Sequence, residues 1–348
     1  MSEAERLRAP AGWDEPALSA TPARGYWASA MRKLARDRAA MFALAAFIVI
    51  VLLCGMAPFY ARDVAGTDPF TSNIGGSTVV GGKTVAVLQQ ATNGLGLGLT
   101  PIGPLWRFGP FMLGADSQGR DVAARLLYGG SNSLMIGAVA TVICLVLATL
   151  TGLIAGFFGG LVDRVISIVL DVLWAFPIYL LAISLSIVLI NQSINIGPLH
   201  IDGSSLLLPM LIIGIVYVPY VARPIRGQVL SLRNSEFVLA ATGLGVPRAR
   251  ILWRDILPNV LSTIIVFAPL MMALNILTEA ALSFLSVGVQ PPAASWGTII
   301  HDGEGLIYTR PLVAIAPGVA IVITVLALNI LGDGLRDALD PRAKVRVG

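Results

Sequence analysis

Two acidic side chains lie inside long apolar stretches of the sequence, where an unpaired charge is costly. Asp171 falls in the run 166–190 and Glu279 in the run 261–285. At the centre of a membrane helix each would cost about 2.5–3.5 kcal/mol on insertion scales, so each is expected to face protein or water. Both are candidates for a pathway or a gate. The alternatives are a pair between Asp171 and Arg164 and a structural pair between Glu279 and another subunit.

Other patterns that could support chemistry are weak. His200 and His301 stand in loops without partner spacing, and Cys54 and Cys144 fall within apolar runs, so neither type has a metal-ligand pattern. Residues 77–84 resemble a phosphate-cradling loop, but the glycine that this pattern needs is displaced by one residue. The sequence has no Gly-x-Ser-x-Gly elbow. It therefore predicts a protein that is not an enzyme and has no cofactor of its own.

A polar segment at 223–260 has the pattern of two helices separated by a break. Ser235 is a candidate N-cap, Gly245 can adopt the left-handed stop that glycine takes most easily, and Pro247 can open the second helix. The break is the sequence Gly243-Leu244-Gly245. We therefore expect a rigid helix, turn and helix.

The first of these helices has the features of a docking element. Ala240 and Ala241 give it a small-residue surface that lets another protein approach closely. Phe237 and Leu244 offer apolar anchors. The pattern predicts a helix that binds in a groove of a partner protein.

The composition indicates that the candidate residues are carried by membrane-spanning helices. Of the 348 residues, 56% are hydrophobic and 13% are charged, whereas soluble domains carry about 25% charged residues. Six stretches are long and apolar enough to span a membrane as helices. They are residues 40–60, 133–158, 166–190, 206–222, 261–285 and 312–331. The predicted fold is an all-α polytopic membrane protein with six transmembrane helices.

The distribution of basic residues predicts the orientation. Placing both termini in the cytoplasm puts three quarters of the 24 Lys and Arg residues on that side. The net charge of +4 thus reflects topology and gives no support to nucleic-acid binding. Trp27, Met31 and Leu34 have the spacing of a helix that lies in the membrane interface, although an ordinary helical linker fits equally well.

A small extracytoplasmic insertion is expected between the first two spans. Residues 72–100 are rich in Gly, Thr and Val and contain the turn signals Gly75-Gly76, Gly81-Gly82 and Asn93-Gly94. Short strands are predicted there. The expected divisions are a cytoplasmic tail at 1–38, a first helix at 39–60, an outer segment at 61–132, a five-helix transmembrane domain at 133–332 and a second tail at 333–348.

The docking segment resembles the EAA loop of ATP-binding-cassette (ABC) importer permeases. The likeness lies in residues 237–245, in Ile251 and in the Ile-Leu-Pro-Asn sequence at 256–259. In that family the loop is the coupling helix, seated in an ATPase subunit, so the resemblance implies coupling roles within 236–258. The residues concerned are Glu236, Phe237, Leu239, Ala240, Ala241, Gly243, Leu244 and Gly245. Leu239 replaces the usual glutamate, and Glu236 is a candidate substitute.

Three further segments resemble the C-type permease of dipeptide and oligopeptide importers, so that the likeness extends from Trp27 to Arg342. They are residues 113–129, 283–297 and 332–342. The first contains the family's extracytoplasmic motif, with alanine at 115 where threonine is usual. Its residues are Gly114, Asp116, Gly119, Arg120, Asp121 and Arg125.

The resemblance implies ATP-driven alternating access in the plasma (cytoplasmic) membrane of a prokaryote. The implied partners are a second, B-type permease, two ATPase subunits or one fused ATPase that bind ATP and Mg, an extracytoplasmic binding protein and membrane lipid. The substrate is expected to be a di- or oligopeptide, with nickel, haem or glutathione as alternatives. A self-sufficient secondary transporter would show inverted repeats or several intramembrane charges, and neither is evident in the sequence.

Overall fold

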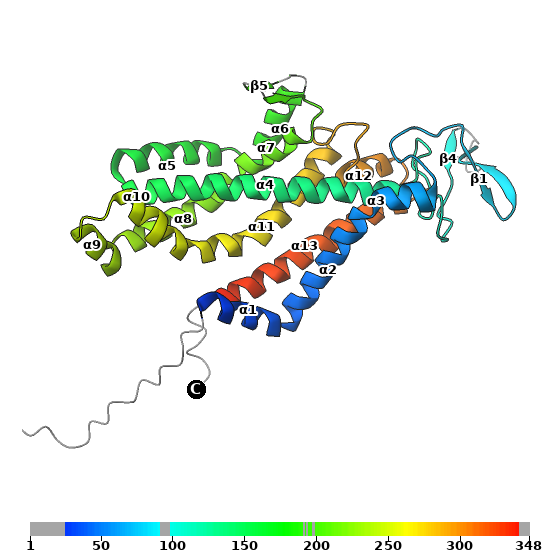
Figure 1. The fold of residues 1–348 in the computed structure, drawn as a ribbon. Helices are drawn as coiled ribbons and strands as arrows, with labels where there is room; N and C mark the ends of the chain where they lie inside the picture. Colours follow the sequence, from blue (N-terminus) through cyan, green and yellow to red (C-terminus); the bar gives the residue numbers. More distant parts are fainter. Residues whose placement is uncertain (1–24, 91–97, 191, 193, 197–198, 341–348) are drawn as a thin grey trace, which may run out of the picture.

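Helices form the body of the molecule in the computed structural model, which describes residues 25–90, 98–190, 192, 194–196 and 199–340 (Figure 1). The helices are α1 (Tyr26–Arg36), α2 (Arg38–Gly55), α3 (Ala57–Phe59), η2 (Tyr60–Ala65), α4 (Val122–Phe158), α5 (Gly160–Ala175), α6 (Ile178–Ile190), α7 (Leu207–Val216), α8 (Val218–Arg233), α9 (Glu236–Gly243), α10 (Arg248–Arg250), η3 (Ile251–Ile256), α11 (Leu257–Phe284), α12 (Trp296–Glu304) and α13 (Leu312–Leu339). η2 and η3 are π-helical turns.

Three antiparallel hairpins complete the described secondary structure. Strands β1 (Ser77–Val80) and β2 (Lys83–Ala86) pair with Ser77 opposite Ala86, and β3 (Leu88–Gln90) pairs with β4 (Leu99–Pro101). β5 (Ile194–Ile196) pairs with β6 (Leu199–Ile201). The strands expected between the first two spans thus have counterparts at 77–101. The predicted turn at 93–94, the arginines at 6, 8 and 24, and residues 341–342 lie outside the described part of the chain.

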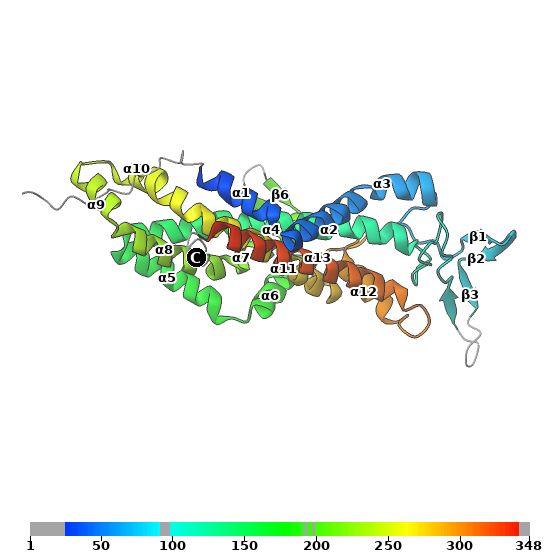
Figure 2. The same cartoon turned by 90° about the horizontal axis from the view of Figure 1, so that it is seen from below.

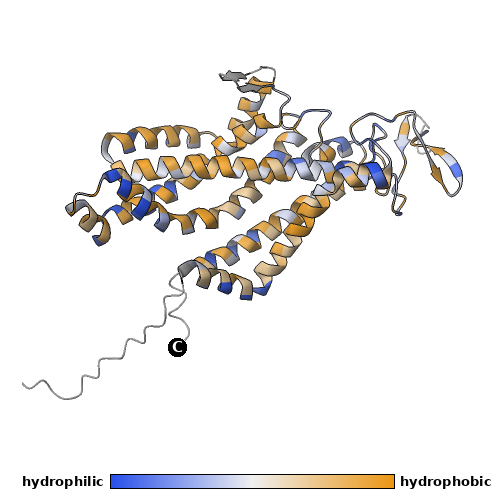
Figure 3. Ribbon diagram, viewed as in Figure 1, coloured by the Kyte–Doolittle hydropathy of each residue, from blue (hydrophilic) through white to orange (hydrophobic). Residues whose placement is uncertain are grey.

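Four helical stretches of the described chain are long and apolar enough to cross a membrane. They are α2, α4, the run 248–284 and α13. Two bent pairs, α5 with α6 and α7 with α8, pass the same test when each is taken as one span, which gives four to six candidate spans. In Figure 3 hydrophobic residues dominate the long helices, and hydrophilic residues gather near their ends.

The third predicted span is not one continuous helix. α5 and α6 meet at an angle of 89°, and Phe176 between them is extended, with φ −89° and ψ 140°. The physical reason is Pro177, which has no N–H to donate and disfavours helical geometry in the residue before it. A hydropathy profile registers the apolar side chains on both sides but not the bend.

The fourth predicted span is also bent, and it is longer than expected. α7 and α8 meet at 42° around Tyr217, and Pro219 stands in the first turn of α8, where proline is tolerated. α8 continues past the predicted end at Ala222 to Arg233. Its arginines shortened the apolar run in the sequence, yet a helix of this kind accommodates charges on one face.

Three other helices extend beyond the apolar stretches or the loop end that the sequence indicated. α4 begins at Val122 rather than at Ser133, because Asp121 caps it and Arg125 is paired inside the protein. α13 extends to Leu339. η3 runs directly into α11, so Pro258 belongs to the first turn of that helix and does not end the loop. Charged residues with partners can continue a helix beyond its apolar stretch.

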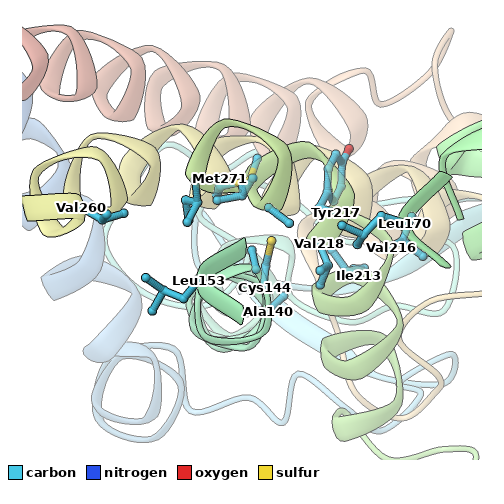
Figure 4. Close-up of a cluster of buried hydrophobic side chains, with 14 of the residues drawn as sticks. Ala140, Cys144, Leu153, Leu170, Ile213, Val216, Tyr217, Val218, Val260 and Met271 are labelled. Atoms are coloured by element: carbon cyan, nitrogen blue, oxygen red, sulfur yellow. The ribbon is translucent and has the colours of Figure 1, made fainter. Parts of the chain in front are cut away.

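The main hydrophobic core forms around α4, between α7, α8 and α11. Figure 4 shows Cys144 of α4 near Ile213 and Val218, and Leu153 further along the same cluster. Two glycines of α4 let α8 approach closely: an added Cβ would lie 2.7 Å from Ile225 at Gly152 and 2.8 Å from Val229 at Gly156. Small residues of this kind allow the close packing that holds membrane helices together.

The molecule is elongated, and two features mark its ends. α9 lies at one end of the long axis and hairpin β1–β2 at the other in both views (Figures 1 and 2); we call these the α9 end and the hairpin end. α1 packs on the end of α13, where Lys33 Nζ donates to the Asp337 carbonyl at 2.7 Å. Leu34 is buried there, whereas Trp27 and Met31 are exposed.

Candidate functional site

Helix α9 is held by its neighbours at its first residue. Ser235 has the extended backbone of an N-cap, with φ −74° and ψ 152°. Its hydroxyl does not cap α9 as predicted, because Oγ donates to the Leu232 carbonyl at the end of α8. The same serine therefore links the end of α8 to the start of α9.

The turn after α9 has the geometry predicted from Gly245. Its φ is +76°, and two hydrogen bonds close the helix: Gly245 N donates to the Thr242 carbonyl at 3.0 Å and Val246 N donates to the Ala241 carbonyl at 3.1 Å. This pair of bonds is the Schellman motif, which ordinarily brings the two flanking residues into apolar contact. Ala241 and Val246 both pack against the main core. The turn thus fixes the direction in which the chain leaves α9.

Apolar side chains project from α9 and its turn. Phe237, Leu239 and Leu244 are 45%, 59% and 84% exposed, whereas Val238 is buried against the core. Glu236, Ala240 and Gly243 are also exposed, and Ala241 is half-buried. Exposed apolar residues that gather on a short, rigid helix are typical of a protein–protein contact.

A cluster of four charges lies near the hairpin end. Asp302 Oδ2 accepts from Arg120 and Arg125, both at 2.8 Å, and Arg120 Nε pairs with Asp116 Oδ2 at 2.7 Å. Arg125 Nη1 also donates to the Pro69 carbonyl at 3.1 Å. Asp116, Arg120 and Arg125 are buried. Two positive and two negative groups therefore tie the chain before α4 to helix α12.

The other predicted motif residues shape the loop that carries this cluster. Gly114 and Gly119 have φ of +88° and +75°, and an added Cβ would lie 2.9 Å from the Ile102 carbonyl at Gly114 and 2.5 Å from the Asn73 carbonyl at Gly119. Asp121 accepts from the N–H groups of Ala123 and Ala124 at the start of α4. Burial raises the pKa of the Asp121 carboxyl, although these backbone donors oppose the rise. The motif thus positions the start of α4.

Glu279 is fully buried and bonded within the chain. Its carboxylate accepts from Ser133 Oγ of α4 and from Ser283 Oγ of α11, both at 2.7 Å. Each serine in turn accepts a backbone N–H: Ser133 from Trp296, the first residue of α12, at 3.1 Å, and Ser283 from Val289 of the α11–α12 connection at 3.0 Å. Glu279 therefore links α4 and α11, through these serines, to the α11–α12 connection and the start of α12.

Asp171 pairs with a residue other than the one expected. Its carboxylate accepts from Arg223 Nη2 of α8 at 2.8 Å, and not from Arg164 of its own helix. The two side chains are 65% and 41% exposed. Asp171 thus stands at the surface of this chain, unlike Glu279.

Sequence reasoning missed Asp302 and Arg223, which complete the two charged groups. Each lies far along the chain from its partners. The one sequence signal was the general requirement that an intramembrane or buried charge have a partner, which does not say which residue that partner is. Within the described residues, no group of three His, Cys, Asp or Glu side chains is placed to hold a metal ion.

Together, the long apolar helices, which supply four to six candidate spans, define a polytopic membrane protein. Residues 148–345 match the family model of the binding-protein-dependent transport system inner membrane component. Residues 25–74 match that of the N-terminal transmembrane domain of oligopeptide transport permease C. The chain belongs to this family and is a permease subunit of an ABC importer.

Relatives support the assignment over most of the chain. An oligopeptide transport system permease protein of Bacillus subtilis is 34% identical over 91% of this chain and 90% of its own. A dipeptide transport system permease protein of Alkalihalophilus pseudofirmus is 41% identical over 66% of this chain and 72% of its own. A glutathione transport system permease protein of Pectobacterium atrosepticum is 40% identical over 67% and 73%.

The fold also resembles a solved structure, that of the MetNI methionine ABC transporter in an inward-facing conformation. The TM-score is 0.50 at 18% identity, and the match covers 62% of this chain and 96% of that chain. At this identity the likeness concerns the fold alone.

Proposed function

We propose that this chain forms half of the membrane pathway of a peptide importer and that α9 is the coupling helix that receives the ATPase movement. The observation that carries the proposal is α9 itself, a short helix fixed by a Schellman turn with Phe237, Leu239 and Leu244 exposed at the far end from the hairpins. The relatives named for dipeptide and oligopeptide transport favour a peptide substrate.

The proposed topology has six spans, with each bent helix pair counted as one, and both termini in the cytoplasm. The α9 end then faces the cytoplasm and the hairpins form the extracytoplasmic insertion. This arrangement places α9 beside two ATPase subunits or one fused ATPase, which bind ATP and Mg. The second permease lies in the membrane, and a binding protein delivers substrate at the hairpin end.

Reconstitution tests subunit dependence. This chain alone in proteoliposomes should neither hydrolyse ATP nor take up a labelled tripeptide, whereas the complex with the second permease, the ATPases and the binding protein should do both. Transport by the lone chain would indicate a self-sufficient secondary transporter and refute the proposal.

Glutathione is the second candidate substrate, because a permease named for glutathione transport is 40% identical. Competition in the reconstituted complex distinguishes the two. Excess unlabelled glutathione should leave uptake of a labelled tripeptide largely unchanged if peptides are the preferred substrate, and should abolish it if glutathione is preferred.

A further inference from the structure

The most exposed side chains of helix α4 are all apolar. Its exposed residues are Met135, Val142, Val146, Leu147, Leu150, Ile154 and Phe158. A face of this composition is suited to lipid tails, which offer no partner for polar groups. The exposed surface of α4 is therefore the reference for a lipid-facing helix in this chain.

The exposed side chains of helix α8 differ in character from those of α4, although the two helices pack side by side where Gly152 of α4 contacts Ile225 of α8. Its exposed residues recur at helical spacing and are polar, small or proline. They are Tyr220, Arg223, Pro224, Gly227, Ser231 and Arg233. An arginine on a lipid face is costly, so this stripe of α8 is suited to water, substrate or protein.

A charged and aromatic surface crosses from α5 over α8 to α11. The Arg223 guanidinium, paired with Asp171, lies over the Trp174 ring at 5.2 Å from its centroid. Trp174 stacks on Tyr220, whose ring meets that of Phe267 edge-on, with both pairs of centroids 6.1 Å apart. One continuous surface thus joins three helices that are separate in sequence.

This surface leads into a cavity of about 1040 Å³ between α8, α11, α1 and the end of α13. Tyr220 and Phe267 line it, and Gln228, Asn259, Ser262 and Thr263 add polar groups. Gln228 is fixed there, because its Nε2 donates to the Asn259 carbonyl and its Oε1 accepts from Thr263. Ligand cavities are commonly about 300–1,000 Å³, so a short peptide fits.

We propose that this surface, from Asp171 and Arg223 through Trp174, Tyr220 and Phe267 into the cavity, is the α9-side wall of the path taken by the peptide. The inference rests on the proposed function and names the residues that contact the substrate. A peptide in transit has an ammonium group, a carboxylate and apolar side chains. Asp171 and Arg223 complement the two charges, and the aromatic faces accept the side chains.

The pairing of the two charges suits transport rather than tight binding. A peptide carboxylate that contacts Arg223 replaces Asp171, and the peptide ammonium group can then pair with Asp171, so that each charge has a partner in the bound state. The net gain is then small, as it must be where a ligand has to leave as readily as it enters.

Cross-linking during turnover tests the assignment directly. In a variant of the complex in which Cys54 and Cys144 are replaced by Ala, Ser262→Cys places a thiol in the cavity and Val146→Cys places one on the lipid-facing side of α4. The tripeptide Ala-Ala-Cys is supplied with binding protein and ATP, and disulfide formation is triggered by an oxidant. We expect the peptide to attach to the residue-262 variant, with ATP dependence, and not to the residue-146 variant.

Each of the other possible outcomes of the cross-linking experiment leads to a different conclusion. If the complex takes up the peptide but it attaches at neither position, this wall is wrong and the proposed function stands. If the second permease attaches at position 262 instead, the surface is a subunit interface and the inference is overturned. If the complex containing the unaltered chain takes up no peptide, the proposed function itself fails.

A charge variant gives a second measurement. Arg223→Gln should lower tripeptide uptake about tenfold, equivalent to about 1.4 kcal/mol of lost contact, with subunit stoichiometry unchanged. Arg223→Lys should restore part of the loss, because it keeps the charge. Equal uptake by the unaltered chain and Arg223→Gln would overturn the role of the charged pair.

Discussion

Replacement of Gly245 by valine should uncouple the assembled complex through backbone strain alone. An added Cβ at Gly245 would meet no heavy atom of the described chain within 4 Å, so no steric clash contributes. The cost is that of holding a β-branched residue at φ +76°, which is about 1–3 kcal/mol. A cost of about 2 kcal/mol lowers the population of the Schellman turn roughly thirtyfold relative to alternatives.

Gly245→Asn should be milder, because asparagine tolerates the left-handed region. The measurement is stimulation of ATPase activity by peptide-loaded binding protein, at equal subunit stoichiometry in proteoliposomes. We expect the valine variant to lose most of the stimulation while it still inserts and assembles, since the membrane helices lie elsewhere.

Gly66→Val is a matched control for this substitution. Gly66 also follows a helical turn at positive φ, +60°, and an added Cβ there likewise meets no described atom within 4 Å. It lies near the hairpin end and should leave ATPase stimulation close to normal. Normal stimulation in Gly245→Val, or equal damage by Val and Asn, would refute the role assigned to the turn geometry.

Three further predictions concern the rest of the molecule. Arg125→Met should lower the unfolding free energy of the complex by about 3 kcal/mol, because it leaves the buried Asp116 and the partly buried Asp302 with Arg120 as their shared partner. Adding Asp302→Leu should recover part of this loss. Equal midpoints for the single and double variants in thermal unfolding would contradict the charge balance. Ser283→Ala should increase amide hydrogen exchange mainly around Val289, and Ser133→Ala should increase it mainly around Trp296. Identical exchange maps for the two variants would exclude two separate links through Glu279. Cysteines introduced at Ser77 and Ser235 in a Cys-free background should react with impermeant reagents from opposite sides of sealed cells, and labelling from one side would disprove the proposed topology.

Local sequence determined the features that depend on a few neighbouring residues. The apolar runs indicated a membrane protein because hydropathy needs no knowledge of packing. Gly245 predicted a left-handed turn because that conformation is a property of one residue's backbone.

Tertiary structure alone decided how charged residues are paired and where helices bend. Asp171 bonds to Arg223 rather than to Arg164 on its own helix, and Arg125 bonds to Asp302, a contact between residues 177 positions apart. Glu279 lies among serines of two helices, although its sequence context had left open both a gate role and a contact with another subunit. Hydropathy and helical spacing act over a few residues, whereas the partner of a buried charge depends on which helices pack together, and that is set by the shape of the whole bundle.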